Sequence, residues 1–216
     1  MESREYLAKQ RENRREVARH ESQHGCILTC GGIQVVSMHI TAETSGKTIF
    51  EYPNPLEFGK LYRKDPHKAR ELTINLVAAC VGPSLASAKE ANAVDADLAA
   101  TFINQWEFRS GKPGAPIRRQ AELRATRWMA QHEKGIAALA SQLFTAGTLE
   151  GVDLQQRLVK AFPQPKRVEK VVPRSKVYST PSTTKKAPTD AWDTLPTDWR
   201  GGFGFGFGSR MYGLTA

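Results

Sequence analysis

Apolar positions recur at helical spacing over most of the first 162 residues. In the first stretch, 2–30, charged residues dominate until Val17, apolar residues follow as far as Leu28, and the pair Gly31-Gly32 comes next. Because a glycine pair stops a helix, this pattern predicts one long helix with an exposed first half and a buried second half.

A change of period follows the predicted helix. Residues 33–41 are rich in β-branched side chains with partial alternation, and a second short run at 48–52 comes after the turn signal Ser45-Gly46. Alternation with a period of two is typical of half-buried strands. We therefore expect a short antiparallel pair of strands.

The rest of the domain again follows the helical period. A helix is predicted to begin at Asp65-Pro66, which supplies a capping residue and a first-turn proline, and to end at Gly82-Pro83. Further helices are predicted over 94–109, over 117–146 and around Leu154, Leu158 and Phe162. The fold class expected is mainly α (α+β), a helical domain with a small antiparallel β element.

Composition changes at Pro163. From there the chain is rich in Pro, Ser, Thr, Lys and Gly, and it contains the repeat Gly-Phe-Gly-Phe-Gly-Phe-Gly at 202–208. With few clustered apolar residues, such a segment cannot offset its chain entropy. We therefore interpret 1–162 as one folded domain and 163–216 as a disordered basic tail.

Charge and cysteine content narrow the possibilities further. The net charge is +9 over 216 residues, and 163–216 carries nine basic and four acidic residues, so the domain itself has only +4. Three cysteines form no disulfide framework, and the start of the chain does not resemble a signal peptide. No apolar run reaches the roughly 20 residues that a membrane helix needs. These features favour a cytoplasmic protein without membrane segments.

The candidate chemistry lies in the buried half of the first helix. His20, Glu21 and His24 form a His-Glu-x-x-His motif. Residues four apart in a helix are only about 40° apart around its axis, so both imidazoles can face one metal ion while Glu21 flanks it. Such a pair can also be simply exposed or hydrogen-bonded, but apolar neighbours place these histidines against a core.

Two histidines and one carboxylate leave the fourth position of a tetrahedral zinc site for water. Asp95 and Asp97, in the first turn of the 94–109 helix, are both candidates for the third ligand, and both can alternatively cap that helix. Cys26 and Cys30 lie too far around the first helix to share the histidines' metal, which favours buried structural thiols.

The stretch from Arg14 to Gly25 resembles the zinc helix of the FtsH-type ATP-dependent zinc metalloproteases, and Gly32 to Thr41 is similar to the strand that follows it. Asp97-Leu98-Ala99-Ala100-Thr101 resembles the family's downstream ligand segment, and Thr148-Leu149-Glu150-Gly151 resembles its closing turn. The resemblance covers roughly 14–160.

This resemblance implies a zinc-dependent endopeptidase with one Zn²⁺ per chain. It implies His20, His24 and Asp97 as metal ligands, with Asp97 favoured over Asp95, and Glu21 as the general base. The strand at 33–41 is expected to pair with an extended polypeptide substrate. Two segments depart from the family pattern, Ser22-Gln23 and Val81-Gly82-Pro83-Ser84. The resemblance therefore predicts the activity less directly than it predicts the fold.

The family's ATPase module has no counterpart in this sequence, because the segment before Gly46-Lys47-Thr48 has Thr41 where a phosphate loop needs its first glycine. Such a domain is expected to cut unfolded chains, or to depend on a separate ATPase or assembly in trans. Two alternatives are a catalytically inactive adaptor or structural protein, and a nucleic-acid-associated protein acting through its basic tail. The second is possible but not favoured.

Overall fold

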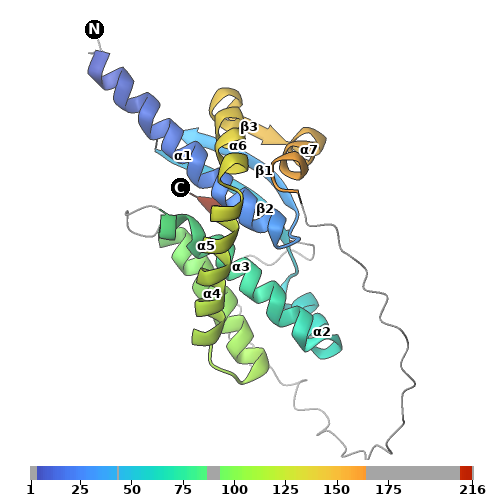
Figure 1. The fold of residues 1–216 in the computed structure, drawn as a ribbon. Helices are drawn as coiled ribbons and strands as arrows, with labels where there is room; N and C mark the ends of the chain where they lie inside the picture. Colours follow the sequence, from blue (N-terminus) through green and yellow to red (C-terminus); the bar gives the residue numbers. More distant parts are fainter. Residues whose placement is uncertain (1–3, 43, 87–92, 164–209, 216) are drawn as a thin grey trace, which may run out of the picture. The chain divides into compact units, whose positions relative to one another are not determined.

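A computed structural model describes residues 4–42, 44–86, 93–163 and 210–215. These residues form a mainly helical α+β fold with a small antiparallel sheet, as predicted (Figure 1). The helices and strands, in chain order, are α1 (Arg4–Cys30), β1 (Val35–Ala42), β2 (Ser45–Tyr52), α2 (Pro55–Lys64), α3 (Pro66–Ala86), α4 (Ala93–Ser110), α5 (Ala115–Gln131), α6 (Glu133–Ala146), β3 (Thr148–Glu150), α7 (Gly151–Ala161) and β4 (Arg210–Thr215).

The chain divides into two units. The first contains 1–164 together with 209–216, and the second contains 165–208. The interpretation of all of 163–216 as a disordered tail is wrong for Arg210–Thr215, which forms β4. The Lys-rich and Gly-Phe-rich stretches lie outside the described residues.

Helix α1 ends where its glycine pair predicts. Gly32 has a positive φ of 71°, and the amide of Ile33 returns to the carbonyl of Leu28 at 2.9 Å, which gives that carbonyl of the last turn a donor and closes the helix. The first turns of α1 are exposed, whereas the turns from Val17 onward are buried. The motif residues therefore lie in the half of α1 that packs on the sheet and on α3 and α6.

The sheet has the strand order β3-β1-β2-β4, and all of its described pairs are antiparallel. The predicted hairpin is present, with Val35 opposite Phe50 and Ile40 opposite Gly46. The expectation that the 33–41 strand pairs with a substrate is contradicted, because β1 lies inside the sheet. β2 occupies one of its edges, and β3 pairs with Ser37 to His39 on the other.

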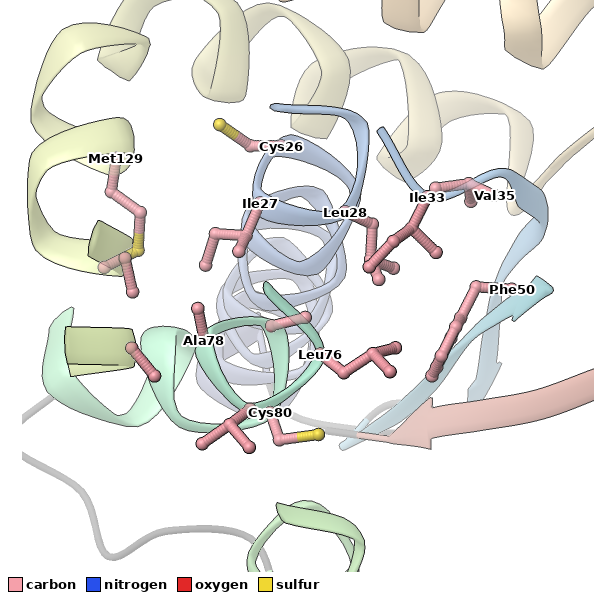
Figure 2. Close-up of a cluster of buried hydrophobic side chains, with 14 of the residues drawn as sticks. Cys26, Ile27, Leu28, Ile33, Val35, Phe50, Leu76, Ala78, Cys80 and Met129 are labelled. Carbon is pink, nitrogen blue, oxygen red and sulfur yellow. The ribbon is translucent and has the colours of Figure 1, made fainter. Parts of the chain in front are cut away.

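Helix α3 forms the centre of the core. It contacts α1, α2, α4 and α5, and its residues from Leu76 to Cys80 are all buried, so it is apolar around its circumference. Figure 2 shows Leu76 directed toward the same space as Leu28 of α1 and Phe50 of β2. Each of these side chains contributes about 1.5–3 kcal/mol through burial.

Three elements differ from the predicted pattern. Helix α2 was not predicted, although Asn54 and Glu57 form a capping box around Pro55. The helix predicted over 117–146 is two helices that meet at His132. Helix α3 continues through Gly82-Pro83 to Ala86 instead of ending there.

The end of α7 approaches α6 closely just after the division at His132. A Cβ atom on Gly135 would lie 2.3 Å from the carbonyl oxygen of Ala161, so the end of α7 packs directly on the backbone of α6. Within the described residues, no helix combines the length and the apolar character that crossing a membrane requires.

Candidate metal centre

The two motif histidines lie on one face of α1, one turn apart. Their Nε2 atoms are 3.0 Å apart, and the rings meet edge to face with centroids separated by 4.7 Å. The side chain of His24 is fully buried, whereas that of His20 is 18% exposed. One histidine is therefore fixed in the core, and the other borders the surface.

Asp95 of α4 supplies a third donor atom to the same point. Its Oδ2 lies 3.4 Å from the Nε2 atom of His20 and 3.4 Å from that of His24. In the described part of the chain these three residues are the one group of His, Cys, Asp or Glu side chains arranged to hold a metal ion. The group can hold a metal ion that neither α1 nor α4 could bind alone.

The triangle formed by these donors matches a tetrahedral metal site. Zinc bonds of about 2.0–2.1 Å at tetrahedral angles separate any two ligand atoms by about 3.3 Å. The three observed separations are 3.0, 3.4 and 3.4 Å. Two neutral imidazoles and one carboxylate are also the ligand chemistry that catalytic zinc uses.

The choice of Asp97 as third ligand is wrong for this structure. Asp97 is exposed, and its carbonyl accepts a hydrogen bond from Thr101 within α4. Residues two positions apart in a helix point about 200° apart around its axis, so Asp95 and Asp97 cannot both face α1. Asp95 shares its face with the buried residues Ala99, Phe102 and Trp106.

A signal for Asp95 was present in the sequence. The apolar face marked by Phe102 and Trp106, continued toward the start of the helix in steps of three and four, reaches Ala99 and then Asp95. An aspartate on the buried face of a helix needs a partner, because an unpaired buried charge is costly. This periodicity selects Asp95, whereas the family resemblance selected Asp97.

A backbone carbonyl fixes the tautomer of His24. Its Nδ1 atom lies 2.8 Å from the carbonyl oxygen of Ala79 in α3. Since a carbonyl can only accept, Nδ1 carries a proton whether or not the ring is charged, and loss of the second proton leaves the lone pair on Nε2, the atom that faces His20 and Asp95.

Pro83 explains why that carbonyl is available. In an uninterrupted helix the carbonyl of Ala79 would accept from the amide of residue 83. Pro83 has no N–H, and it lies inside α3. The proline that was predicted to end the helix therefore leaves an acceptor on α3 for His24.

The charges of the cluster shift two pKa values in opposite directions. Burial alone lowers the pKa of His24, but the hydrogen bond and negative charge of Asp95, with the charge of Glu21, outweigh it and raise the pKa above the ordinary 6.5. Burial raises the pKa of Asp95, but its hydrogen bonds to His20 and His24 dominate and lower it below the ordinary 3.8. The site therefore favours a negative carboxylate beside positive charge.

Glu21 is held beside the histidines by strand β2. Its side chain is fully buried, and the hydroxyl of Thr48 donates a hydrogen bond of 2.6 Å to Oε2. Gly46 lies against the same side chain, because a Cβ at this position would stand 2.7 Å from Cγ of Glu21 and 2.8 Å from its Oε1. The sequence pattern assigned Gly46 and Thr48 to a turn, a strand and a rejected phosphate-loop motif, and none of these predicted their contact with Glu21.

The remaining candidate groups lie outside the cluster. Cys26 is buried, as predicted, whereas Cys30, which was also predicted to be buried, is only partly buried; Cys80 is buried as well. Burial raises the pKa of Cys80, which keeps that thiol protonated. His39 of β1 contacts the hydroxyl groups of Ser37 and Thr148 at 2.8 and 3.2 Å.

The chain was compared with families and proteins already described. No family model matches it, and neither a curated protein nor a solved structure matches it.

Proposed function

We propose that this chain is a zinc-dependent metalloendopeptidase, with His20, His24 and Asp95 as metal ligands and Glu21 as general base. The observation that carries the proposal is the donor triangle, which joins two helices distant in sequence, together with a buried glutamate on the same helix. The resemblance of 14–160 to FtsH-type peptidase domains supports the same reaction.

Each group of the site has a separate role in the proposed reaction. Zinc, when bound, lowers the pKa of a water molecule toward about 7 and polarises a substrate carbonyl. Glu21 would accept one proton from the attacking water as the water oxygen bonds to the peptide carbon. When the C–N bond breaks, Glu21 returns the proton to the leaving amine, so water and peptide give one carboxyl and one amine product.

Thr48 positions the general base. Its hydroxyl holds Oε2 of Glu21, so the carboxylate is fixed before substrate arrives. The partial exposure of His20 places the edge of the site at the protein surface. We propose unfolded or loosely folded polypeptides as substrates, delivered either by diffusion or by a separate ATPase in trans.

Hydrolysis of fluorescently labelled casein by the zinc-loaded full chain tests this function. Glu21→Gln is expected to lower kcat/KM by about 10²–10⁴-fold, because it removes the proton acceptor. Zinc content is measured in parallel and is expected to stay at one per chain. The matched control is Glu16→Gln, on the exposed part of the same helix, which is expected to retain full activity.

Casein hydrolysis that is unchanged in Glu21→Gln would contradict the proposed mechanism. If the parent protein and variants of β4 all bind zinc but hydrolyse nothing, that result would contradict the peptidase function itself. That second result would support an inactive adaptor with a retained metal site.

A further inference from the structure

The outer edge of β2 is occupied by the end of the same chain. β2 pairs with β1 along its inner edge, and β4 pairs antiparallel with Lys47 to Tyr52 along its outer edge. In the absence of β4 that edge would present its N–H and C=O groups unpaired, as a template for any extended chain. The other three strands of the sheet all lie between Val35 and Glu150, whereas β4 comes from Arg210–Thr215.

This edge passes the candidate general base. Gly46 and Thr48 of β2 both contact Glu21. In the register of the sheet the backbone of Leu214 lies opposite Thr48, and Thr215 lies opposite Lys47. β4 also contacts α1 and α4, the two helices that carry the metal-binding triad. An extended segment on this edge therefore runs beside the site.

Backbone pairing suits a ligand of variable sequence. When a peptide adds a strand to a sheet edge, its main-chain hydrogen bonds supply affinity whatever its side chains are. A site that acts on unfolded polypeptides needs this kind of recognition. The segment Arg-Met-Tyr-Gly-Leu-Thr at 210–215 contains no proline, which would remove a donor from the ladder.

We propose that the outer edge of β2 is a binding site for extended polypeptides, and that Arg210–Thr215 occupies it as an internal ligand that competes with substrates. The part of this inference that concerns catalysis rests on the proposed peptidase function. The part that concerns binding does not. Displacement of β4 converts the covered edge into an open one, and the apparent affinity for substrate rises with the fraction of open molecules.

Proline substitutions in the full chain open this edge. N–H groups alternate in direction along a strand, so of two neighbouring residues one directs its N–H toward β2. Gly213→Pro and Leu214→Pro are therefore made separately, and at least one of them removes a donor from the ladder. Leu214→Ala, which keeps the N–H, is the matched control.

Two measurements test binding without reference to catalysis. A fluorescent peptide with the sequence of residues 209–216 is expected to bind the more disruptive proline variant about tenfold more tightly than the parent chain. A tenfold difference corresponds to β4 covering the edge in about nine-tenths of the parent molecules. Amide exchange at Lys47 to Tyr52 is expected to speed up in that variant and to slow again when peptide is added. Equal peptide affinity in parent, control and both proline variants would overturn the proposal.

Casein hydrolysis separates the two proposals. A rise of about tenfold in kcat/KM in the disruptive variant, at unchanged zinc content, supports both. Hydrolysis that is equal in all four proteins, with equal peptide binding, overturns the occupied edge and leaves the peptidase function standing. Tighter peptide binding in a zinc-loaded variant that hydrolyses nothing supports the edge and overturns the peptidase function.

Discussion

At the scale of single residues, the candidate site depends on a few side chains that neighbouring residues of the same type could not replace. Asp95 is the clearest case, because its neighbour two positions later has the same charge and a better match to the family pattern yet faces solvent. What distinguishes the two is helix phase. The sequence predicted His20, His24 and Glu21 through local spacing, whereas the third position was missed because the family pattern was followed instead of the buried face of α4.

Gly46 is expected to be intolerant of even a methyl group. A Cβ there would lie 2.8 Å from Cγ1 of Val17 as well as 2.7 Å from Cγ of Glu21, and both neighbours are buried. Gly46→Ala should therefore destabilise the fold by about 1–3 kcal/mol and displace Glu21, the proposed general base. Urea unfolding and casein hydrolysis measure the two effects, with Lys47→Ala as control. Full activity in Gly46→Ala would show that Glu21 is not held by this contact.

The opposed pKa shifts predict how stability varies with pH in metal-free protein. His24 has a raised pKa, so its contribution is complete below pH 6.5 and is lost as pH rises through the folded value. Asp95 has a lowered pKa, so its contribution is complete above pH 3.8 and is lost as pH falls through the folded value. Metal-free protein should therefore lose stability as pH rises above 6.5.

Zinc binds the neutral form of His24, so the stability of the zinc-loaded protein should not fall in this way as pH rises. The difference in Tm between zinc-loaded and metal-free protein is accordingly expected to grow from pH 6 to pH 8. Thermal unfolding with and without zinc measures it, and His132→Ala serves as a control histidine outside the cluster. A difference that stays constant over this range, or shrinks, would contradict the coupling of His24 to the metal.

At the scale of elements, the sequence predicted those parts of the fold that local signals determine. The stop at Gly31-Gly32, the start at Asp65-Pro66 and the β1–β2 hairpin all follow from residues adjacent to the boundary. Helix α2 had an equally local signal in its capping box, which was overlooked. The division at His132 had no such signal in the pattern.

Pro83 shows how tertiary structure reverses a local rule. The proline should end α3, yet the carbonyl it leaves without a helical donor becomes the acceptor for Nδ1 of His24. Burial of Cys80 and its neighbours in the core maintains the helix at this point. Pro83, where the sequence departs from the family that it resembles, is thus part of the support of the candidate metal site.

Pro83→Ala is expected to weaken zinc while leaving the fold intact. The new N–H competes for the carbonyl of Ala79, so the orientation of His24 is less well fixed, and loss of such support typically costs 10–100-fold in metal affinity. Stability of the metal-free protein should not fall, because alanine favours the helix. Competition with a zinc chelator measures the affinity, and Ser84→Ala is the control. Unchanged zinc affinity would contradict a role for Pro83 in positioning His24.

At the scale of the whole molecule, the site joins parts of the chain that are distant in sequence. α1 supplies two histidines and the glutamate, β2 fixes the glutamate, α3 orients His24, and α4 contributes Asp95. Periodicity identifies the buried face of each helix, but it does not say which elements those faces meet. The same applies to β4, whose composition suggested a tail but whose backbone completes the sheet.

The central claim is that His20, His24 and Asp95 bind one zinc ion, and metal content tests it most directly. Full-length protein is purified under reducing conditions and analysed for metals, alongside His24→Ala, Asp95→Asn and Asp97→Asn. We expect one zinc per chain in the parent and in Asp97→Asn, and strong loss in His24→Ala and Asp95→Asn. Zinc that is absent from the parent protein, or lost in Asp97→Asn but kept in Asp95→Asn, would contradict the site described here.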